Sequence, residues 1–309
     1  MTRREARTTT GADRARRLRD LLHERSLTFL MEAHDGLSAR IVERSGFGGA
    51  WASGFSISTS LGLRDSNEAS VSQVLDTIEY MADATSMPIV VDGDTGFGNF
   101  NNARRLVRKL CQLGVAGVCI EDKLFPKTNS FFGSNHPLAD IGEFCGRIQA
   151  CKDSQLHDGF VVVARTEAFI AGRGLIEAIK RAEAYRDAGA DAIFVHSRST
   201  SPDEILSFGE AWSGELPLVV SPTTYHGVEA RQLEEAGVSL VIWGNHNLRA
   251  AASAMRRTCE EILRSSSVAG VEPDLATLDD IFDLLDYDEL AAAEARYLPA
   301  RSSSREPWE

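Results

Sequence analysis

The stretch Asn101–Ile120, NNARRLVRKLCQLGVAGVCI, contains the unit that decides the fold. Its first part spaces apolar side chains as an amphipathic helix does, and Gly114 follows as a helix-ending residue. Val115–Ile120 is then a nearly continuous apolar run, typical of a buried strand. The same helix–Gly–strand junction recurs at Gly189 and Gly237. A short helix-to-strand turn that repeats in this way predicts successive β–α units.

Eight apolar runs of strand length alternate with helical segments along the chain. Such runs are typical of parallel strands that are covered on both faces. No glycine-rich dinucleotide fingerprint follows the first run, which disfavours an open nucleotide-binding sheet. Eight units therefore predict the α/β class and a closed (β/α)8 barrel of the TIM type. The expected strands are Leu27–Ala33, Gly49–Phe55, Pro88–Val91, Val115–Ile120, Phe160–Ala164, Ala192–Val195, Leu216–Val220 and Leu240–Trp243.

Composition divides the chain into four parts. Residues 1–26 are expected to form an N-terminal arm, and the acidic residues in its Arg-rich opening favour a solvent-exposed first helix over a transit peptide. Residues 27–264 would form the barrel, the catalytic domain. A Ser-rich break separates it from a C-terminal helical extension over 265–298, whose main helical segment is Leu275–Tyr297. The tail 299–309 is expected to be disordered.

Charge and cysteine content exclude several classes of protein. The formal net charge is -12 and the pI about 5.1, so no positive surface for nucleic acid is expected. No apolar run approaches the roughly 20 residues of a membrane span, and no apolar signal core is present near the N-terminus. The five cysteines form no CxxC pair, which indicates buried, reduced thiols and a cytoplasmic location. They are Cys111, Cys119, Cys145, Cys151 and Cys259.

Acidic residues end two neighbouring predicted strands, on the barrel face that carries the active site in proteins of this type. Asp92 and Asp94 end the third strand and Glu121 ends the fourth, so their carboxylates should converge. Clustered carboxylates repel one another unless a cation or protons intervene. Oxygen ligands without His or Cys select Mg2+, with Mn2+ as the alternative. We expect one carboxylate to bind the metal directly and the others to hold its waters; the alternative for Asp94 is a local turn cap.

Arg165 and His196, which end the fifth and sixth strands, predict the positive and hydrogen-bonding side of the site. Arg offers a planar fork to carboxylate or phosphate oxygens, and His can donate to an oxyanion. The longest connection, Asp122–Leu138, has the length of a functional lid, and its Lys and Asn side chains could close onto an anion. The structural alternatives are an ion pair between Arg165 and Glu167, a satisfied interior His196, and an ordinary exposed loop.

Four segments, in the same order along the chain, resemble one family. Glu121–Ser130, EDKLFPKTNS, matches the EDK-five residues-NS signature of the phosphoenolpyruvate mutase family, within the isocitrate lyase/PEP mutase superfamily. The resemblance extends from Ser26 to Leu298. The other matching segments are Trp51–Gly54 (WASG), Asp92–Gly98 (DGDTGFG) and Arg165–Ala168 (RTEA).

The resemblance implies roles for the matched residues at the metal and the substrate. Asp92 would be the direct Mg2+ ligand, Asp94 and Glu121 would hold metal-bound waters, and Asp65 would lie nearby. The family usually has Leu where this chain has Phe55, a difference that could alter the shape of the pocket. The implied substrate-binding residues are Trp51, Ser53, Gly54 and Phe55.

The resemblance also implies which side chains handle the migrating group. Arg165 and His196 would contact the phosphoryl group. The lid would contribute further residues to the catalytic set, namely Lys127, Asn129 and Ser130.

The implied reaction is the reversible conversion of phosphoenolpyruvate to 3-phosphonopyruvate, an isomerisation that makes the C–P bond in phosphonate biosynthesis. It would be an intramolecular phosphoryl transfer from the enol oxygen to C3, whose loose transition state requires mainly positioning and electrostatics. The family further implies a homotetramer, a dimer of dimers, that exchanges the C-terminal helical segment between neighbouring subunits. Because the equilibrium is expected to favour phosphoenolpyruvate, an enzyme that consumes phosphonopyruvate is the expected functional partner.

Three alternatives remain beside the mutase. A C–C lyase of the isocitrate or methylisocitrate lyase type would carry a Cys in its Lys-Lys/Arg-Cys-Gly-His loop, and the loop Asp122–Leu138 has none. Phosphonopyruvate hydrolase, in which water takes the phosphoryl group, is the closer alternative, and Asn129 favours the mutase. A barrel retained for binding or assembly would have little reason to keep the carboxylates, Arg165, His196 and the lid together.

Overall fold

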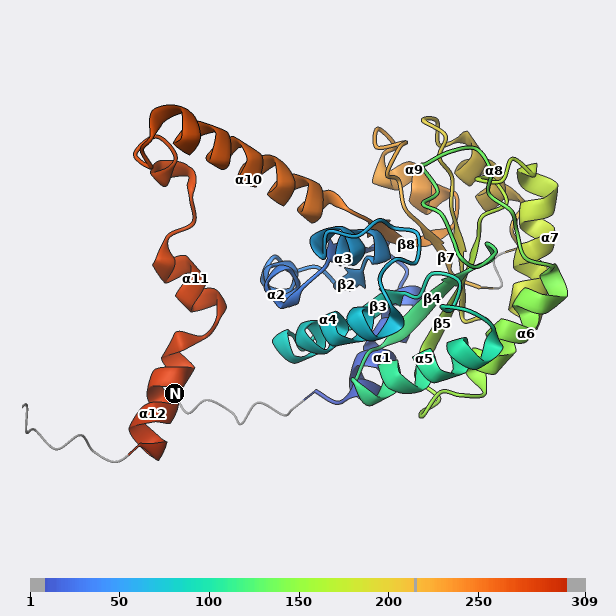
Figure 1. The fold of residues 1–309 in the computed structure, drawn as a ribbon. Helices are drawn as coiled ribbons and strands as arrows, with labels where there is room; N and C mark the ends of the chain where they lie inside the picture. The colour runs from blue at the N-terminus through green and yellow to red at the C-terminus, as the bar shows by residue number, and fades with distance from the viewer. Residues whose placement is uncertain (1–8, 214–215, 299–309) are drawn as a thin grey trace, which may run out of the picture. The chain divides into compact units, whose positions relative to one another are not determined.

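The computed structural model describes residues 9–213 and 216–298. Its parallel strands close into a barrel in sequence order, β1 to β8, with helices around the outside (Figure 1). The predicted (β/α)8 fold is confirmed. The strands are β1 (Thr28–Ala33), β2 (Gly49–Ala52), β3 (Ile89–Asp92), β4 (Gly117–Glu121), β5 (Val161–Thr166), β6 (Ala192–Val195), β7 (Leu218–Val220) and β8 (Val238–Trp243).

The helices connect the strands and continue after the last of them. The three predicted helix-ending glycines, Gly114, Gly189 and Gly237, all have positive φ, which glycine adopts without a steric penalty. The helices are α1 (Gly11–His23), α2 (Gly36–Arg44), α3 (Gly54–Ser60), α4 (Val71–Ala84), α5 (Phe100–Gln112), α6 (Ile141–Lys152), α7 (Gly174–Asp187), α8 (Asp203–Ala211), α9 (Ala230–Glu235), α10 (His246–Ser265), the 3-10 helix η1 (Glu272–Asp274), α11 (Leu278–Leu284) and α12 (Tyr287–Tyr297).

Strand register places the polar strand ends beside one another. Glu121 of β4 is directly opposite Arg165 of β5, and Asp92 of β3 is opposite Cys119 of β4. Parallel strands present their carboxyl ends at one rim of the barrel, so these side chains share that rim. The closed sheet therefore positions the site that the strand ends predicted.

The first helix corrects the prediction of a solvent-exposed arm. Ala15, Leu18 and Leu22 are buried and belong to the same apolar cluster as Leu30 and Trp51 of the barrel strands. Their spacing of three and four residues gives α1 one apolar face, which the density of Arg in this segment obscured. Residues 1–8 of the predicted arm lie outside the described residues.

The second predicted strand was too long. β2 ends at Ala52, and Ser53 caps α3, with its Oγ accepting a hydrogen bond from the Ser56 amide. A Ser at this position satisfies one of the free amides of a helix start. The polypeptide therefore turns at the predicted substrate-binding segment, and Phe55 is on α3.

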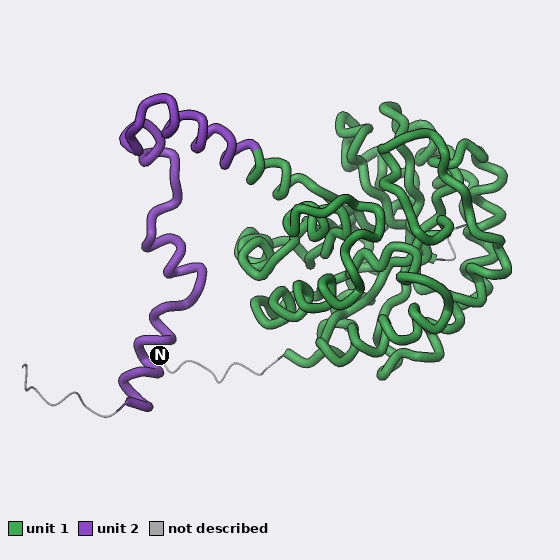
Figure 2. The backbone as a smooth tube through the Cα atoms, viewed as in Figure 1, with its two compact units in different colours: residues 1–252 green, residues 253–309 purple. Residues whose placement is uncertain are grey.

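The chain divides into two compact units, one up to Ala252 and the other from Ser253 onward, drawn green and purple in Figure 2. The boundary falls within α10. In the second unit the helical segment expected over Leu275–Tyr297 is broken between α11 and α12, where Asp286 has a positive φ. The tail 299–309 lies outside the described residues.

The cysteines are all free. Cys111, Cys119 and Cys151 are buried as predicted, Cys145 is half-buried, and Cys259 is exposed, against the prediction. Within the described ranges, none of the helices is both long and apolar enough to cross a membrane.

Two helical glycines give a matched test of the packing. A Cβ on Gly209 in α8 would lie 2.1 Å from the Ala236 backbone oxygen, whereas a Cβ on Gly146 in α6 would meet nothing within 4 Å. We predict that Gly209→Ala lowers the free energy of unfolding by about 1–3 kcal/mol because the clash is with backbone. Gly146→Ala should raise it by about 0.5–1 kcal/mol through helix propensity. Equal shifts in urea denaturation would contradict this packing.

Candidate active site

A cavity of about 240 Å³ opens at the carboxyl ends of the strands. Ten of the thirteen predicted site residues line it: Trp51, Ser53, Phe55, Asp65, Asp92, Lys127, Asn129, Ser130, Arg165 and His196. Each of the other three predicted residues is in contact with a residue that lines the cavity. The Gly54 amide donates to Asp92, Asp94 pairs with Lys127, and Glu121 pairs with Arg165. The structure thus brings the whole predicted set together.

The acidic side of the cavity is poorly solvated. Burial raises the pKa of Asp92, and burial raises the pKa of Asp94 to about 8 despite the opposing effect of Lys127. One oxygen of Glu121, Oε1, is buried and has no hydrogen-bond partner within the described part of the chain; Lys123 Nζ lies 3.9 Å from it. Protons or a cation are needed to stabilise this arrangement.

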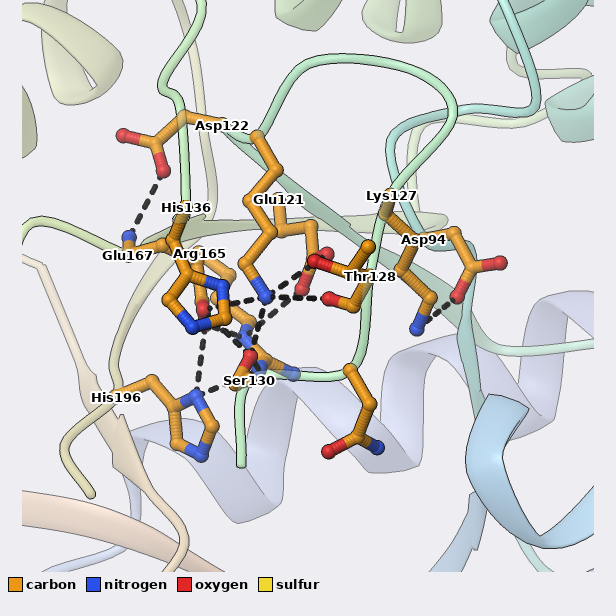
Figure 3. Close-up of polar contacts among 12 residues, drawn as sticks. Asp94, Glu121, Asp122, Lys127, Thr128, Ser130, His136, Arg165, Glu167 and His196 are labelled. Carbon is orange, nitrogen blue, oxygen red and sulfur yellow. Dashed lines mark hydrogen bonds and ion pairs between the residues drawn. The ribbon is translucent and has the colours of Figure 1, made fainter. Parts of the chain in front are cut away.

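Lys127 of the lid supplies one positive charge to these acids. Its Nζ lies 2.9 Å from Asp65 Oδ1. It lies 2.7 Å from Asp94 Oδ1 (Figure 3). Burial acts to lower the pKa of Lys127, but the carboxylates outweigh burial and raise it well above its ordinary value. Asp94 is therefore more than the turn cap considered as its alternative.

Asn67 is a site residue that the sequence did not reveal. Its Nδ2 donates to Asp94 Oδ2 at 2.8 Å, and its Oδ1 accepts from the Lys127 amide at 2.7 Å. Asn67 has a positive φ of 58°, a conformation that Asn tolerates better than most residues. It lies in the connection after α3, far from any strand end, so the strand-end rule could not find it.

The lid residue Asn129 points toward the same acids. Its Nδ2 donates to Asp65 Oδ2 at 2.7 Å, while its Oδ1 accepts from the Phe131 amide at 2.9 Å. The lid therefore meets the barrel through both Lys127 and Asn129, which share Asp65 as a partner.

Arg165 and His196 are in contact on the opposite side of the cavity. Arg165 Nη2 lies 2.6 Å from His196 Nδ1, and Arg165 Nε lies 2.5 Å from Glu167 Oε1 and 3.3 Å from Glu121 Oε2. The ion pair with Glu167, considered as the structural alternative for Arg165, is thus present in a residue that also lines the cavity.

His196 is tuned toward its neutral form. Burial and the neighbouring Arg165 guanidinium lower its pKa. Its Nδ1 also lies 2.7 Å from Glu167 Oε1, so this nitrogen is engaged within the protein and Nε2 is the atom that could meet a ligand.

The far wall of the cavity contains neutral polar residues that the sequence did not single out. Ser221 and Thr223 follow β7, and Asn245 follows β8. The strand-end rule would have found all three if it had been applied to uncharged residues. Asn245 Oδ1 is buried without a hydrogen-bond partner among the described residues.

The charges around the cavity test whether a divalent cation fits. Within the described residues, no three His, Cys, Asp or Glu side chains lie close enough to hold one ion together, so joint direct ligation by Asp92, Asp94 and Glu121 is not supported.

The balance of charges around the cavity nevertheless favours binding of a divalent cation. The carboxylates are Asp65, Asp92, Asp94, Glu121 and Glu167. Among the described residues, the Lys and Arg side chains that form ion pairs with them are Lys123, Lys127 and Arg165. With His196 neutral and all five carboxylates ionised, two negative charges would remain on a donor set made only of oxygens, which suits Mg2+. The pKa of Asp94, raised to about 8, means that a proton takes the place of such a cation when none is bound.

The fold and this cavity define a barrel enzyme in which buried carboxylates face Arg, Lys and His side chains beneath a lid. The sequence model of the family described as phosphoenolpyruvate phosphomutase matches residues 18–263. The chain belongs to the phosphoenolpyruvate phosphomutase family.

Known proteins resemble the chain over nearly its full length. The phosphoenolpyruvate phosphomutase of Tetrahymena pyriformis is 53% identical over 282 residues, which cover 91% of this chain and 94% of that protein. A crystal structure of phosphoenolpyruvate phosphomutase from Streptomyces platensis subsp. rosaceus has a TM-score of 0.91 at 44% identity, covering 92% and 99%. A phosphonopyruvate hydrolase in complex with oxalate and Mg2+ has a TM-score of 0.87 at 39% identity, covering 93% and 99%.

The Lys127 ion pairs give a test of the buried charge. We predict that Lys127→Met lowers the free energy of unfolding by about 3 kcal/mol in EDTA, because it leaves buried carboxylates without their cation. The control, Arg231→Met, breaks an exposed pair with Glu235 and should change it by less than about 0.5 kcal/mol. Denaturation curves with equal shifts for both variants would contradict the assignment.

Proposed function

We propose that this enzyme interconverts phosphoenolpyruvate and 3-phosphonopyruvate by intramolecular phosphoryl transfer, the C–P bond-forming step that begins phosphonate biosynthesis. The observation that carries the proposal is the convergence of Asn129 from the lid with Arg165 and His196 on one cavity beside Asp92. The likeness to the Tetrahymena phosphomutase supports the same reaction.

We propose Mg2+ as the cofactor, with Mn2+ as a substitute. Asp92 would be its direct ligand, and Asp94 and Glu121 would hold its waters. When bound, the metal supplies positive charge that stabilises an enolate and offsets the excess of carboxylates. The donor chemistry and the raised pKa of Asp92 support this assignment, as does Mg2+ in the related hydrolase.

The pyruvyl part of the substrate would bind between β2 and α3. Ser53 and the Gly54 amide lie where the chain turns from strand to helix, and the Gly54 amide already faces an Asp92 oxygen at 3.4 Å. These donors would hold the substrate carboxylate, with Trp51 and Phe55 as the apolar walls. Phe55 is bulkier than the Leu usual in the family and would narrow this part of the pocket.

The phosphoryl group would lie between Arg165, His196 and Asn129. A loose, metaphosphate-like transition state spreads negative charge over the transferring oxygens, so the protein acts chiefly by holding donors in place. Arg165 can offer its guanidinium. Neutral His196 can donate through Nε2 only in the tautomer whose Nδ1 accepts from Arg165 at 2.6 Å, and in that tautomer Nδ1 does not donate to Glu167 Oε1. Asn129 would leave Asp65 to donate to the substrate when the substrate binds.

Lid residues separate this proposal from its superfamily alternatives. A lyase of this superfamily would need a Cys on the lid, and the nearest one in sequence, Cys119, is buried in β4 with a pKa raised well above its ordinary value. The hydrolase would need water at the phosphoryl group, whereas Asn129, Ser130 and Phe131 line the cavity from the lid. A closed, dry site favours transfer within the substrate.

We further propose a cytoplasmic homotetramer, a dimer of dimers in which the C-terminal unit is exchanged between subunits. The second unit carries exposed apolar side chains such as Leu278, Phe282 and Leu290, and α11 and α12 bury none of their residues. Apolar surface of this kind marks an interaction site. We expect the equilibrium to favour phosphoenolpyruvate, so flux toward phosphonates would need a coupled enzyme that consumes phosphonopyruvate.

The reaction can be followed by 31P NMR of the purified enzyme with phosphonopyruvate and Mg2+. We predict that the phosphoenolpyruvate resonance appears, and that EDTA stops its appearance while added Mg2+ restores it. Free phosphate as the main product would favour the hydrolase, and no change in either arm would refute both activities.

A further inference from the structure

We infer that Glu167 is a positioning residue that latches the lid, and that its hydrogen bond with Ser130 sets how often water intercepts the migrating phosphoryl group. The inference rests on the proposed function for its chemical step. It gives Glu167 a second role, holding the lid through Ser130, in addition to its ion pair with Arg165.

Glu167 is fully buried, and its carboxylate joins four side chains (Figure 3). Oε2 accepts from Ser130 Oγ at 2.6 Å and lies 3.0 Å from Lys123 Nζ. Oε1 lies 2.5 Å from Arg165 Nε and 2.7 Å from His196 Nδ1. One oxygen thus serves the lid loop, and the other serves the pair proposed to hold the phosphoryl group.

A second buried hydrogen-bond network fixes the backbone of Glu167. The Glu167 amide donates to Asp122 Oδ1 at 2.8 Å. Asp122 Oδ2 accepts from Arg181 at 3.0 Å and from the Tyr185 hydroxyl at 2.5 Å. Arg181 and Tyr185 belong to α7, so Asp122, the first residue of the lid connection, and the Glu167 backbone are anchored to a helix of the barrel.

Ser130 is the lid side of this latch. Its Oγ accepts from Lys123 and from Arg165 while it donates to Glu167. On either side of it in the chain, Asn129 contacts Asp65 and the Phe131 ring packs edge-on against His196 with centroids 5.4 Å apart. Placing Ser130 on Glu167 therefore places the adjacent lid residues over the cavity.

The consequence for the reaction follows from water access. With the Ser130 hydroxyl gone, the lid loses its hydrogen bond to Glu167 Oε2, so the lid opens more often during transfer and water enters. In an open site the C3–P bond of phosphonopyruvate breaks while a bond forms between phosphorus and a water oxygen. The enolate takes a proton at C3, and the products are pyruvate and inorganic phosphate.

The test measures how turnover divides between phosphoenolpyruvate and phosphate. In 31P NMR with Mg2+ and phosphonopyruvate, we expect Ser130→Ala and Glu167→Gln to raise the share of phosphate about tenfold over wild type, the effect of losing one charge-assisted hydrogen bond. The matched controls are Ser45→Ala and Glu235→Gln, which alter exposed residues outside the site and should leave the share unchanged. If both latch variants formed the same share of phosphate as the wild type, the inference would be overturned.

Lid opening is measured separately by chymotrypsin cleavage after Phe132, which is 80% exposed on the lid. Both latch variants should be cleaved faster there than wild type and the controls, and equal rates would overturn the latch. This arm requires no catalysis. If the wild-type enzyme produced no phosphoenolpyruvate, the proposed function would fail, while faster cleavage of the variants would still support the latch. Because Ser130→Ala leaves the buried ion pairs of Glu167 in place, it remains informative if Glu167→Gln folds poorly.

Discussion

The structure around the cavity depends on one constraint, an excess of carboxylates whose side chains are buried. Buried like charges raise one another's pKa, and a desolvated carboxylate without a partner is costly. Lys127 is held between two of these acids, and Arg165 lies between Glu121 and Glu167. Each cation is thereby fixed in place before any substrate arrives. The negative charge that remains is the basis for the proposed divalent cation.

The same constraint explains why the lid is part of the site rather than a cover over it. Lys127 of the lid neutralises part of the charge of Asp65 and Asp94, so moving the lid away would leave these carboxylates without their cation. Glu167 adds a second link through Ser130 on the other side of the cavity. A lid held at two separate places by buried polar contacts can exclude water while still being able to open. Transfer of a phosphoryl group within one molecule requires this combination.

The sequence predicted the barrel and the strand-end residues because both follow from rules with a physical basis. Parallel strands end at one rim, so Asp92, Glu121 and Arg165 could be placed together without knowledge of the packing. Asn67 could not be predicted, because its contacts depend on the path of an irregular connection. The role of Glu167 was hidden because a carboxylate two residues after an Arg is explained as well by a local ion pair. The buried face of α1 was missed because its Arg residues masked an apolar spacing.

The central claim is that the phosphoryl group moves within a single substrate molecule inside a closed site. An isotope crossover experiment tests it most directly. Phosphonopyruvate labelled with 13C at C3 and with 18O in the phosphonyl group is mixed with unlabelled phosphonopyruvate, and the phosphoenolpyruvate formed is examined by mass spectrometry. Product molecules that carry both labels or neither are the predicted result. Molecules that carry only one of the two labels would show exchange between substrates and would contradict the account.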